Sequence, residues 1–112
     1  MSRLENSLRF ATKLKLERIA RKQPGFVYLI QCQDFVKVGI AVDVDIRLIT
    51  LQTGNPYELT LLASWQVDDM QGAEARLHAL WRQYSVRGEW FRPPFGEVVA
   101  AMNADSFEKI FE

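Results

Sequence analysis

Apolar and polar positions divide most of the chain into strands and helices in a clear order. Two nearly continuous apolar runs, residues 26–31 and 35–41, are typical of buried strands. Residues 59–67 alternate between apolar and polar types, which indicates a strand with one buried face. Helical spacing predicts one helix from an N-cap at Asp43 to about Leu51, and a second helix that starts near Asp68. The predicted order is therefore strand, strand, helix, strand, helix.

The two ends of the chain are predicted to differ in character. Residues 1–24 form a basic helical arm, which Pro24 and Gly25 end because the residue before a proline avoids the helical region. Residues 25–112 form the domain proper. Near its end, a short aromatic segment at Trp90 precedes a helical region over residues 95–111, either continuous or in two pieces with a new cap at Asp105.

The first two strands are expected to form a hairpin. With a loop of two or four residues, paired positions sum to 65, so that Tyr28 faces Lys37 across the hairpin. Directly opposed side chains share a face of the sheet, with Cβ atoms roughly 5 Å apart. A loop of three residues would shift the register by one and separate the pair. The hairpin register therefore decides whether these two side chains are neighbours.

Composition indicates one ordinary globular domain in a reducing compartment. The chain has 112 residues, 48% of them hydrophobic and 25% charged. No apolar run approaches the ~20 residues of a membrane helix, so we expect no membrane partner. The single cysteine, Cys32, has no partner for an internal disulfide, which favours a cytoplasmic location.

Charge is distributed unevenly along the chain. Residues 1–24 carry seven basic and two acidic side chains, a net charge of +5, so the remainder carries −5 because the total is zero. A basic arm is consistent with nucleic-acid binding, but a helix with a solvated charged face is an equal alternative. The acidic body argues against tight DNA binding by the domain alone.

Four side chains in this pattern suit phosphodiester hydrolysis. Tyr28 offers a phenol, Lys37 an ammonium group, Arg47 a guanidinium for a phosphate, and Glu74 a carboxylate for a hard cation. Each also has a structural interpretation. Tyr28 could be a half-buried sheet residue, Lys37 an edge lysine whose amine reaches solvent, and Arg47 the partner of Asp43 one helical turn earlier.

His78 lies one turn after Glu74 on the second predicted helix. It could contact a phosphate or transfer a proton, or it could simply hydrogen-bond Glu74 at the rim.

The ordered motifs resemble those of the GIY-YIG nuclease superfamily, in its phage-type branch. The matching runs are V-Y at Tyr28, V-K-V-G over residues 36–39, an arginine at 47, T-G-N-P over 53–56, E-x-x-x-H over 74–78 and G-E-W-F over 88–91. Lys37 stands where the general pattern has its second tyrosine, and neither Asn55 nor Asn103 matches the late active-site asparagine.

The resemblance implies an α+β fold with a three-stranded antiparallel sheet flanked by helices. It also implies a divalent-metal-dependent DNA endonuclease, in which Tyr28 activates water, Lys37 tunes it, Arg47 holds the phosphate and Glu74 binds one Mg²⁺ or Mn²⁺ ion together with the DNA. The implied partners are DNA and a separate DNA-targeting domain or protein. The alternative is a nucleic-acid-binding or interaction module that keeps the fold and does not cleave. A third interpretation is a subunit that cleaves only when joined to a targeting partner.

Overall fold

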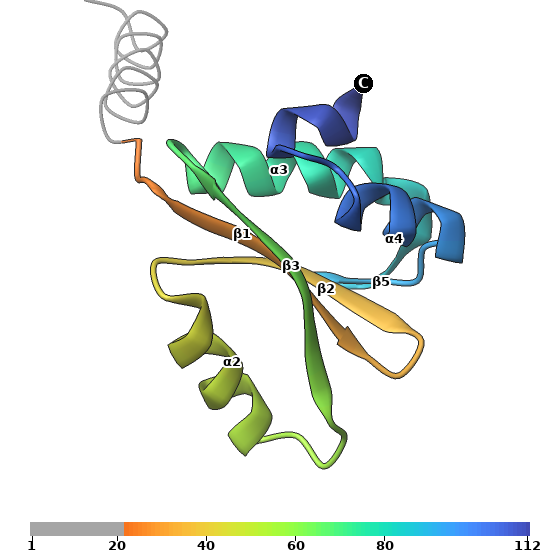
Figure 1. The fold of residues 1–112 in the computed structure, drawn as a ribbon. Helices are drawn as coiled ribbons and strands as arrows, with labels where there is room; N and C mark the ends of the chain where they lie inside the picture. The colour runs from red at the N-terminus through yellow and green to blue at the C-terminus, as the bar shows by residue number, and fades with distance from the viewer. Residues whose placement is uncertain (1–21) are drawn as a thin grey trace, which may run out of the picture.

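The computed structural model describes residues 22–112, which form a five-stranded antiparallel sheet with helices on both faces (Figure 1). The strand order across the sheet is β3-β1-β2-β5-β4. The strands are β1 (Gly25–Cys32), β2 (Phe35–Ala41), β3 (Leu59–Val67), β4 (Ser85–Arg87) and β5 (Trp90–Phe91). The helices are α2 (Val44–Thr53), α3 (Met70–Leu80) and α4 (Phe95–Met102), with short 3₁₀ turns η1 (Arg82–Tyr84) and η2 (Phe107–Phe111).

The hairpin of β1 and β2 forms, but in a different register from the predicted one. Cys32 pairs with Phe35, and Tyr28 lies opposite Gly39 rather than Lys37. The direct Tyr28–Lys37 pairing was therefore wrong. The connecting loop contains Gln33, whose φ of 55° is a left-handed conformation. Because the register differs by two residues, every side chain keeps the predicted face of the sheet, and Tyr28 and Lys37 remain diagonal neighbours.

The expected three-stranded sheet is correct for β3, β1 and β2 but omits two short strands. β4 and β5 form a hairpin that extends the sheet beyond β2. Gly88 lies in its turn with φ of +56°, a conformation that glycine adopts without strain. Only Val36 and Lys37 of β2 pair with β5, so no strand among residues 22–112 lies beside the edge of β2 from Gly39 onward.

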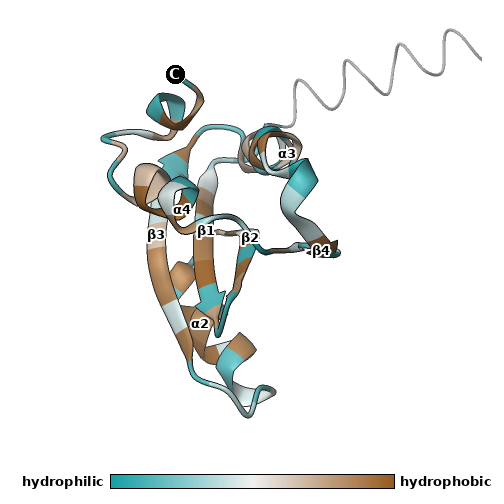
Figure 2. Cartoon of the chain, turned by 90° about the vertical axis from the view of Figure 1, so that its right-hand side faces the viewer, coloured by the Kyte–Doolittle hydropathy of each residue, from teal (hydrophilic) through white to brown (hydrophobic). Residues whose placement is uncertain are grey.

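Two apolar layers pack against opposite faces of the sheet. Val27 and Leu29 of β1 point toward α3 and α4, whereas Tyr28 and Ile30 point toward α2. Figure 1 shows the same division, with α2 on one side of the strands and α3 and α4 on the other. In Figure 2, β1 and β3 are largely brown, as expected for strands between helices. Alternate residues of β1 therefore build two separate cores.

Most predicted element ends are confirmed. Asp43 accepts a hydrogen bond from the backbone of Ile46 at 3.0 Å and caps α2. Asp69 caps α3 in the same way, through the backbone of Gly72 at 3.1 Å. The C-terminal region does divide into two pieces, although η2 begins after Ser106 rather than at Asp105. The predicted helical arm over residues 1–24 lies almost entirely outside the described residues.

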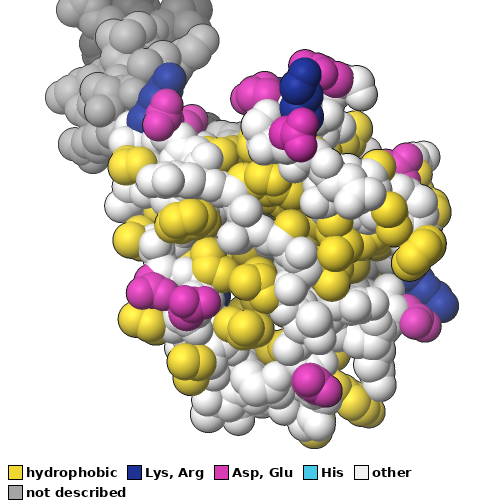
Figure 3. All heavy atoms as spheres, in the orientation of Figure 1, with side chains coloured by type: hydrophobic (Ala, Val, Ile, Leu, Met, Phe, Trp, Pro, Cys, Tyr) yellow, Lys and Arg dark blue, Asp and Glu magenta, His cyan; other side chains and the backbone are white. Residues whose placement is uncertain are grey.

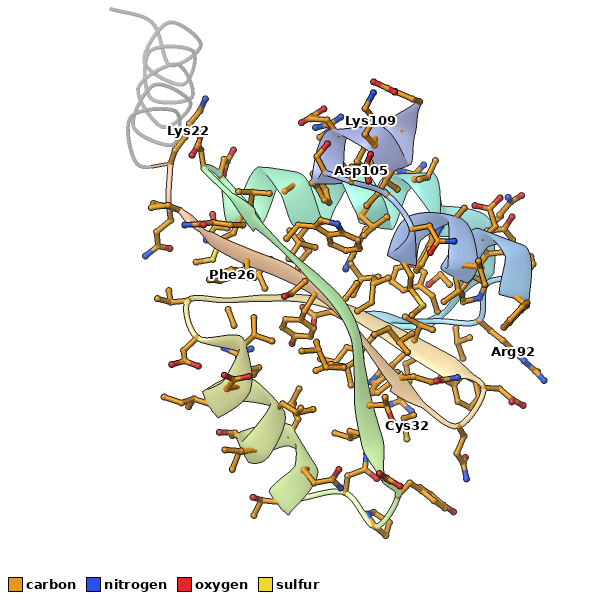
Figure 4. The ribbon with its side chains drawn as sticks, viewed as in Figure 1. Lys22, Phe26, Cys32, Arg92, Asp105 and Lys109 are labelled. Atoms are coloured by element: carbon orange, nitrogen blue, oxygen red, sulfur yellow. The ribbon has the colours of Figure 1, made fainter. Side chains whose placement is uncertain are left out.

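The surface carries both apolar and charged groups. Val42, Ile46 and Ile49 are exposed on and beside α2, and hydrophobic side chains are visible there at the lower left of Figure 3. Figure 4 places Phe26 and Cys32 toward opposite ends of β1, and Arg92 pointing outward beyond β5. Among residues 22–112, no helix is long and apolar enough to cross a membrane.

Candidate active site

The Tyr28 ring occupies space that is left open because the residue opposite it on β2 is a glycine. It is 0% exposed, and its ring lies over Gly39, the residue opposite it on β2. A Cβ atom built on Gly39 would overlap the hydroxyl and ring atoms of Tyr28. The glycine of the V-K-V-G run is therefore needed because a side chain there would displace the tyrosine. The ring thus crosses β2 at the point where β2 loses its strand partner.

The environment of the Tyr28 hydroxyl opposes ionisation. The hydroxyl is buried and has no hydrogen-bond partner. Burial raises the pKa of Tyr28 above its ordinary value of 10.0, and the charges of Lys37 and Arg47 lower it by a smaller amount. The expectation that Lys37 lowers this pKa is correct in sign, but desolvation is the larger effect. The phenol is therefore protonated at neutral pH in the free protein.

Arg47 approaches this phenol from α2. The Arg47 guanidinium lies near the phenol and lowers the pKa of Tyr28, although no hydrogen bond to the hydroxyl forms among the described residues. The alternative role, an ion pair with Asp43, does not form within the described structure, where the Asp43 carboxylate accepts from a backbone N–H instead. Arg47 is an exposed residue, so its planar group is available for an incoming phosphate.

Lys37 is an unusually enclosed lysine. Its side chain is only 16% exposed, and its Nζ lies 2.9 Å from a carboxylate oxygen of Glu89. The Nζ is also 5.5 Å from the ring centre of Trp90. An edge lysine whose amine simply reaches solvent would be more exposed, so the structure does not support that interpretation. Lys37 instead places a fixed positive charge between the tyrosine and the acidic residues of the site.

Glu74 reaches the same region from α3, on the other face of the sheet. Its Oε2 atom is buried and has no hydrogen-bond partner. Burial raises the pKa of Glu74 above its ordinary value of 4.5, and the nearby carboxyl group of Glu89 raises it further through charge and a hydrogen bond to the protonated form. That hydrogen bond requires a proton on one of the two carboxyl groups, because two ionised carboxylates have no donor between them. His78 and Lys37 act in the opposite direction and lower the pKa of Glu74 by a smaller amount.

His78 binds the sheet rather than Glu74. Its Nε2 lies 2.9 Å from the backbone oxygen of Val38, so Nε2 carries the hydrogen and donates it. Its ring also packs edge-on against Phe91, with ring centres 5.0 Å apart. The interpretation of a histidine bonded to Glu74 was wrong. His78 joins α3 to the outer edge of β2 at Val38. Its Nδ1 remains as an acceptor that can take up a proton, and only then can it donate to a phosphate oxygen.

Glu89 is the residue of this site that the sequence did not single out. It belongs to the G-E-W-F run, which was interpreted through its aromatic residues. Its backbone oxygen accepts a hydrogen bond from the backbone of Val38 at 3.0 Å, which fixes Glu89 beside β2. The sequence did offer one indication, because Glu89 directly precedes Trp90 and Phe91. Phe91 is buried in the core with 2% exposure, so its neighbour Glu89 is held close to the sheet.

The T-G-N-P run has a structural role. Asn55 accepts from the backbone of Tyr57 at 2.9 Å and approaches the Cys32 sulfur at 3.8 Å. Gln52 binds the same loop through the backbone oxygen of Tyr57 at 2.9 Å and the backbone nitrogen of Leu59 at 2.8 Å. These bonds form the turn from α2 into β3, so Asn55 is not free to serve the site.

A shallow depression of about 430 Å³ lies beside Glu74 and His78. Its rim includes Arg82, which is exposed, and Ser85. A basic group and a hydroxyl group beside a partly buried carboxylate suit a DNA phosphate backbone passing over the site.

The donor groups fit a hard divalent cation that a substrate would share. Mg²⁺ binds oxygen ligands and is often held by one or two carboxylates plus substrate phosphates. The buried Oε2 atom of Glu74 has unused lone pairs that such an ion would satisfy. Within residues 22–112, no three Asp, Glu, His or Cys side chains gather into a metal site. The residues therefore fit an ion whose remaining coordination positions are filled by substrate phosphates and water.

Comparison with known proteins identifies a family for this chain. No curated protein sequence and no solved structure matches the chain. The family model of the T5orf172 domain matches residues 25–106, from the first residue of β1 nearly to the end of the chain. This span covers the sheet, α2, α3, α4 and every candidate residue described above. The chain therefore belongs to the T5orf172 domain family, which is related to GIY-YIG nuclease-like domains.

Proposed function

We propose that this chain is a divalent-metal-dependent DNA endonuclease of GIY-YIG type. One observation carries the proposal. Among the described residues, the only buried side-chain oxygen or nitrogen atoms without a hydrogen-bond partner are the Tyr28 hydroxyl and Glu74 Oε2. Such atoms are rare in folded proteins and call for an explanation, of which a catalytic role is one. Both belong to residues that the sequence motifs assign to the reaction.

The charges around these two atoms support the same chemistry. Lys37 influences the ionisation of both Tyr28 and Glu74, and Glu89 does likewise. The side chains from β1, β2, α2 and α3 therefore act on one region, although the two helices lie on opposite faces of the sheet. These residues adjoin the edge of β2 from Gly39 onward, which no strand among residues 22–112 pairs and where a DNA backbone can approach.

Each residue has a distinct part in the proposed reaction. Arg47 binds the scissile phosphate and holds it in line with a water molecule. Tyr28 first loses its own proton to solvent and then accepts a proton from that water, while the water oxygen bonds to phosphorus. The bond from phosphorus to the leaving oxygen breaks, and that oxygen takes a proton from solvent. Lys37 stabilises the phenolate, and Glu74 would hold the Mg²⁺ or Mn²⁺ ion. When bound, such an ion supplies positive charge that offsets the charge developing on the phosphate oxygens.

A second candidate function is DNA binding without cleavage. The observation that favours it is the complete burial of Tyr28 together with its raised pKa, since a base must be both ionised and accessible to its substrate. Cleavage therefore requires that DNA binding expose the phenol of Tyr28. A subunit that cleaves only beside a targeting partner would need that partner for the same change.

Nicking of supercoiled plasmid distinguishes these candidates. Wild-type chain with Mg²⁺ or Mn²⁺ is expected to convert supercoiled into open-circular DNA, and chelation by EDTA should stop the reaction. Tyr28→Phe and Glu74→Ala should each abolish nicking. Glu97→Ala, at an exposed carboxylate on α4, is the matched control and should retain it. A Tyr28→Phe variant as active as wild type would rule out the proposed mechanism.

A further inference from the structure

Glu89 occupies a position between the basic and the acidic parts of the site. Its carboxylate pairs with Lys37 at 2.9 Å and is also close enough to Glu74 to hydrogen-bond it when one of the two is protonated. Its backbone is fixed to β2 through Val38 at 3.0 Å. A glutamate in a solvent-exposed turn would not need to be fixed through both its backbone oxygen and its carboxylate. We therefore considered what the Glu89 carboxylate could bind.

We propose that Glu89 is the second protein ligand of the divalent cation, beside Glu74, and that Lys37 takes the place of the cation on Glu89 when none is bound. This inference rests on the proposed function, because it concerns the same cation. It adds a ligand that neither the sequence motifs nor the family match assigns.

Two separate observations point to a cation at this position. The first is the buried Oε2 atom of Glu74, which has no hydrogen-bond partner and no ion pair among residues 22–112. The second is that the pair already holds one positive group, because the Lys37 ammonium lies against Glu89 with only 16% of its side chain exposed. A lysine side chain is rarely so enclosed unless it is paired. The site is therefore built around a positive charge.

The arrangement has a consequence for Tyr28. While Lys37 pairs with Glu89, its ammonium is shared between the carboxylate and the phenol. A divalent cation held by Glu74 and Glu89 would neutralise the carboxylate charge and leave the Lys37 ammonium to the phenol. Binding of the ion by Glu74 and Glu89 would thus increase the stabilisation that Lys37 gives to the Tyr28 phenolate.

Binding of Mn²⁺ to the full-length chain without DNA tests the proposal, with free Mn²⁺ measured by electron paramagnetic resonance. Glu89→Gln is isosteric and 43% exposed at its side chain, so it should fold normally, as circular dichroism would verify. We expect it to weaken Mn²⁺ binding at least tenfold, as Glu74→Gln should. Glu97→Gln, at an exposed carboxylate on α4, should bind Mn²⁺ as wild type does.

Lys37→Met is expected to have the opposite effect and to tighten Mn²⁺ binding, because it removes the competing ammonium. A general loss of positive charge would also tighten binding, so the same change is made in the Glu89→Gln background. If Lys37 competes through Glu89, Lys37→Met should change Mn²⁺ affinity less than twofold there. An equal tightening in both backgrounds would overturn the competition.

The outcomes also separate this proposal from the proposed function. If only Glu74→Gln weakens Mn²⁺ binding, Glu89 is not a ligand, whereas the endonuclease proposal keeps its metal residue. If neither variant weakens binding, the cation site lies elsewhere, and both proposals lose their support.

Discussion

Tyr28→Phe should make the protein more stable while it removes cleavage. The substitution deletes one oxygen atom and keeps the ring that packs over Gly39, so it opens no cavity of consequence. The deleted hydroxyl is buried without a hydrogen-bond partner. Leaving such a group unsatisfied costs about 1–3 kcal/mol, and its removal recovers part of that cost. The charges of Lys37 and Arg47 offset little of the gain, because they favour the phenolate and not the neutral phenol.

We therefore expect the free energy of unfolding to rise by about 1 kcal/mol at pH 7. For a domain of this size, 1 kcal/mol corresponds to a rise in Tm of roughly 4–8 °C. Urea unfolding of both proteins in EDTA, followed by tryptophan fluorescence, measures the change. Tyr57→Phe, at a tyrosine that is 53% exposed, is the matched control and should shift stability by less than about 0.5 kcal/mol. A Tyr28→Phe variant less stable than wild type would show that the hydroxyl is hydrogen-bonded, and the argument from unpartnered atoms would fail.

Three further predictions follow from the same site and from the charge of the arm. Gly39→Ala should destabilise the fold by about 1–3 kcal/mol in urea unfolding, because the added methyl group overlaps Tyr28, and nicking should be lost with it. Glu74 has a raised pKa in the folded state, so the stability that its protonation contributes is present below pH 4.5 and is lost as pH rises through the folded pKa. Glu74→Gln should therefore gain stability relative to wild type as pH increases from 4 to 8, and a difference independent of pH would contradict this reasoning. Deleting residues 1–22 should weaken DNA binding and flatten its dependence on salt, because phosphate contacts are lost, whereas an unchanged slope in titrations at several salt concentrations would assign the arm another role.

The sequence predicted the larger elements because their patterns are long. The apolar runs of β1 and β2, the alternation of β3, and the caps at Asp43 and Asp69 each gave a clear signal. The hairpin register was wrong because a shift of two residues leaves every side chain on the same face, so burial alone does not separate the two registers. The turn gave no help, since Gln33 adopts a positive φ that is usual for glycine and asparagine.

The parts that were missed are short or depend on the assembled fold. β4 and β5 have three and two residues, too few for a periodic pattern. Glu89 gained its place from a backbone bond to Val38 that joins segments far apart in the chain. The net pKa direction of Tyr28 depended on how completely α2 covers it, and no sequence pattern gives the depth of burial. The candidate residues were found through motifs, but their balance of charges needed the structure.

The most direct test of the central claim is cleavage of labelled duplex and branched DNA, with binding measured on the same samples. The account predicts that wild-type chain cuts one or both substrates with Mg²⁺ or Mn²⁺, and that Glu74→Ala binds them with similar affinity but leaves them intact. Glu74 is only partly buried, so the variant should fold, and circular dichroism verifies this. Wild-type chain that binds both DNAs and cuts neither with either ion would contradict the account, and the non-cleaving binding module would then be the function.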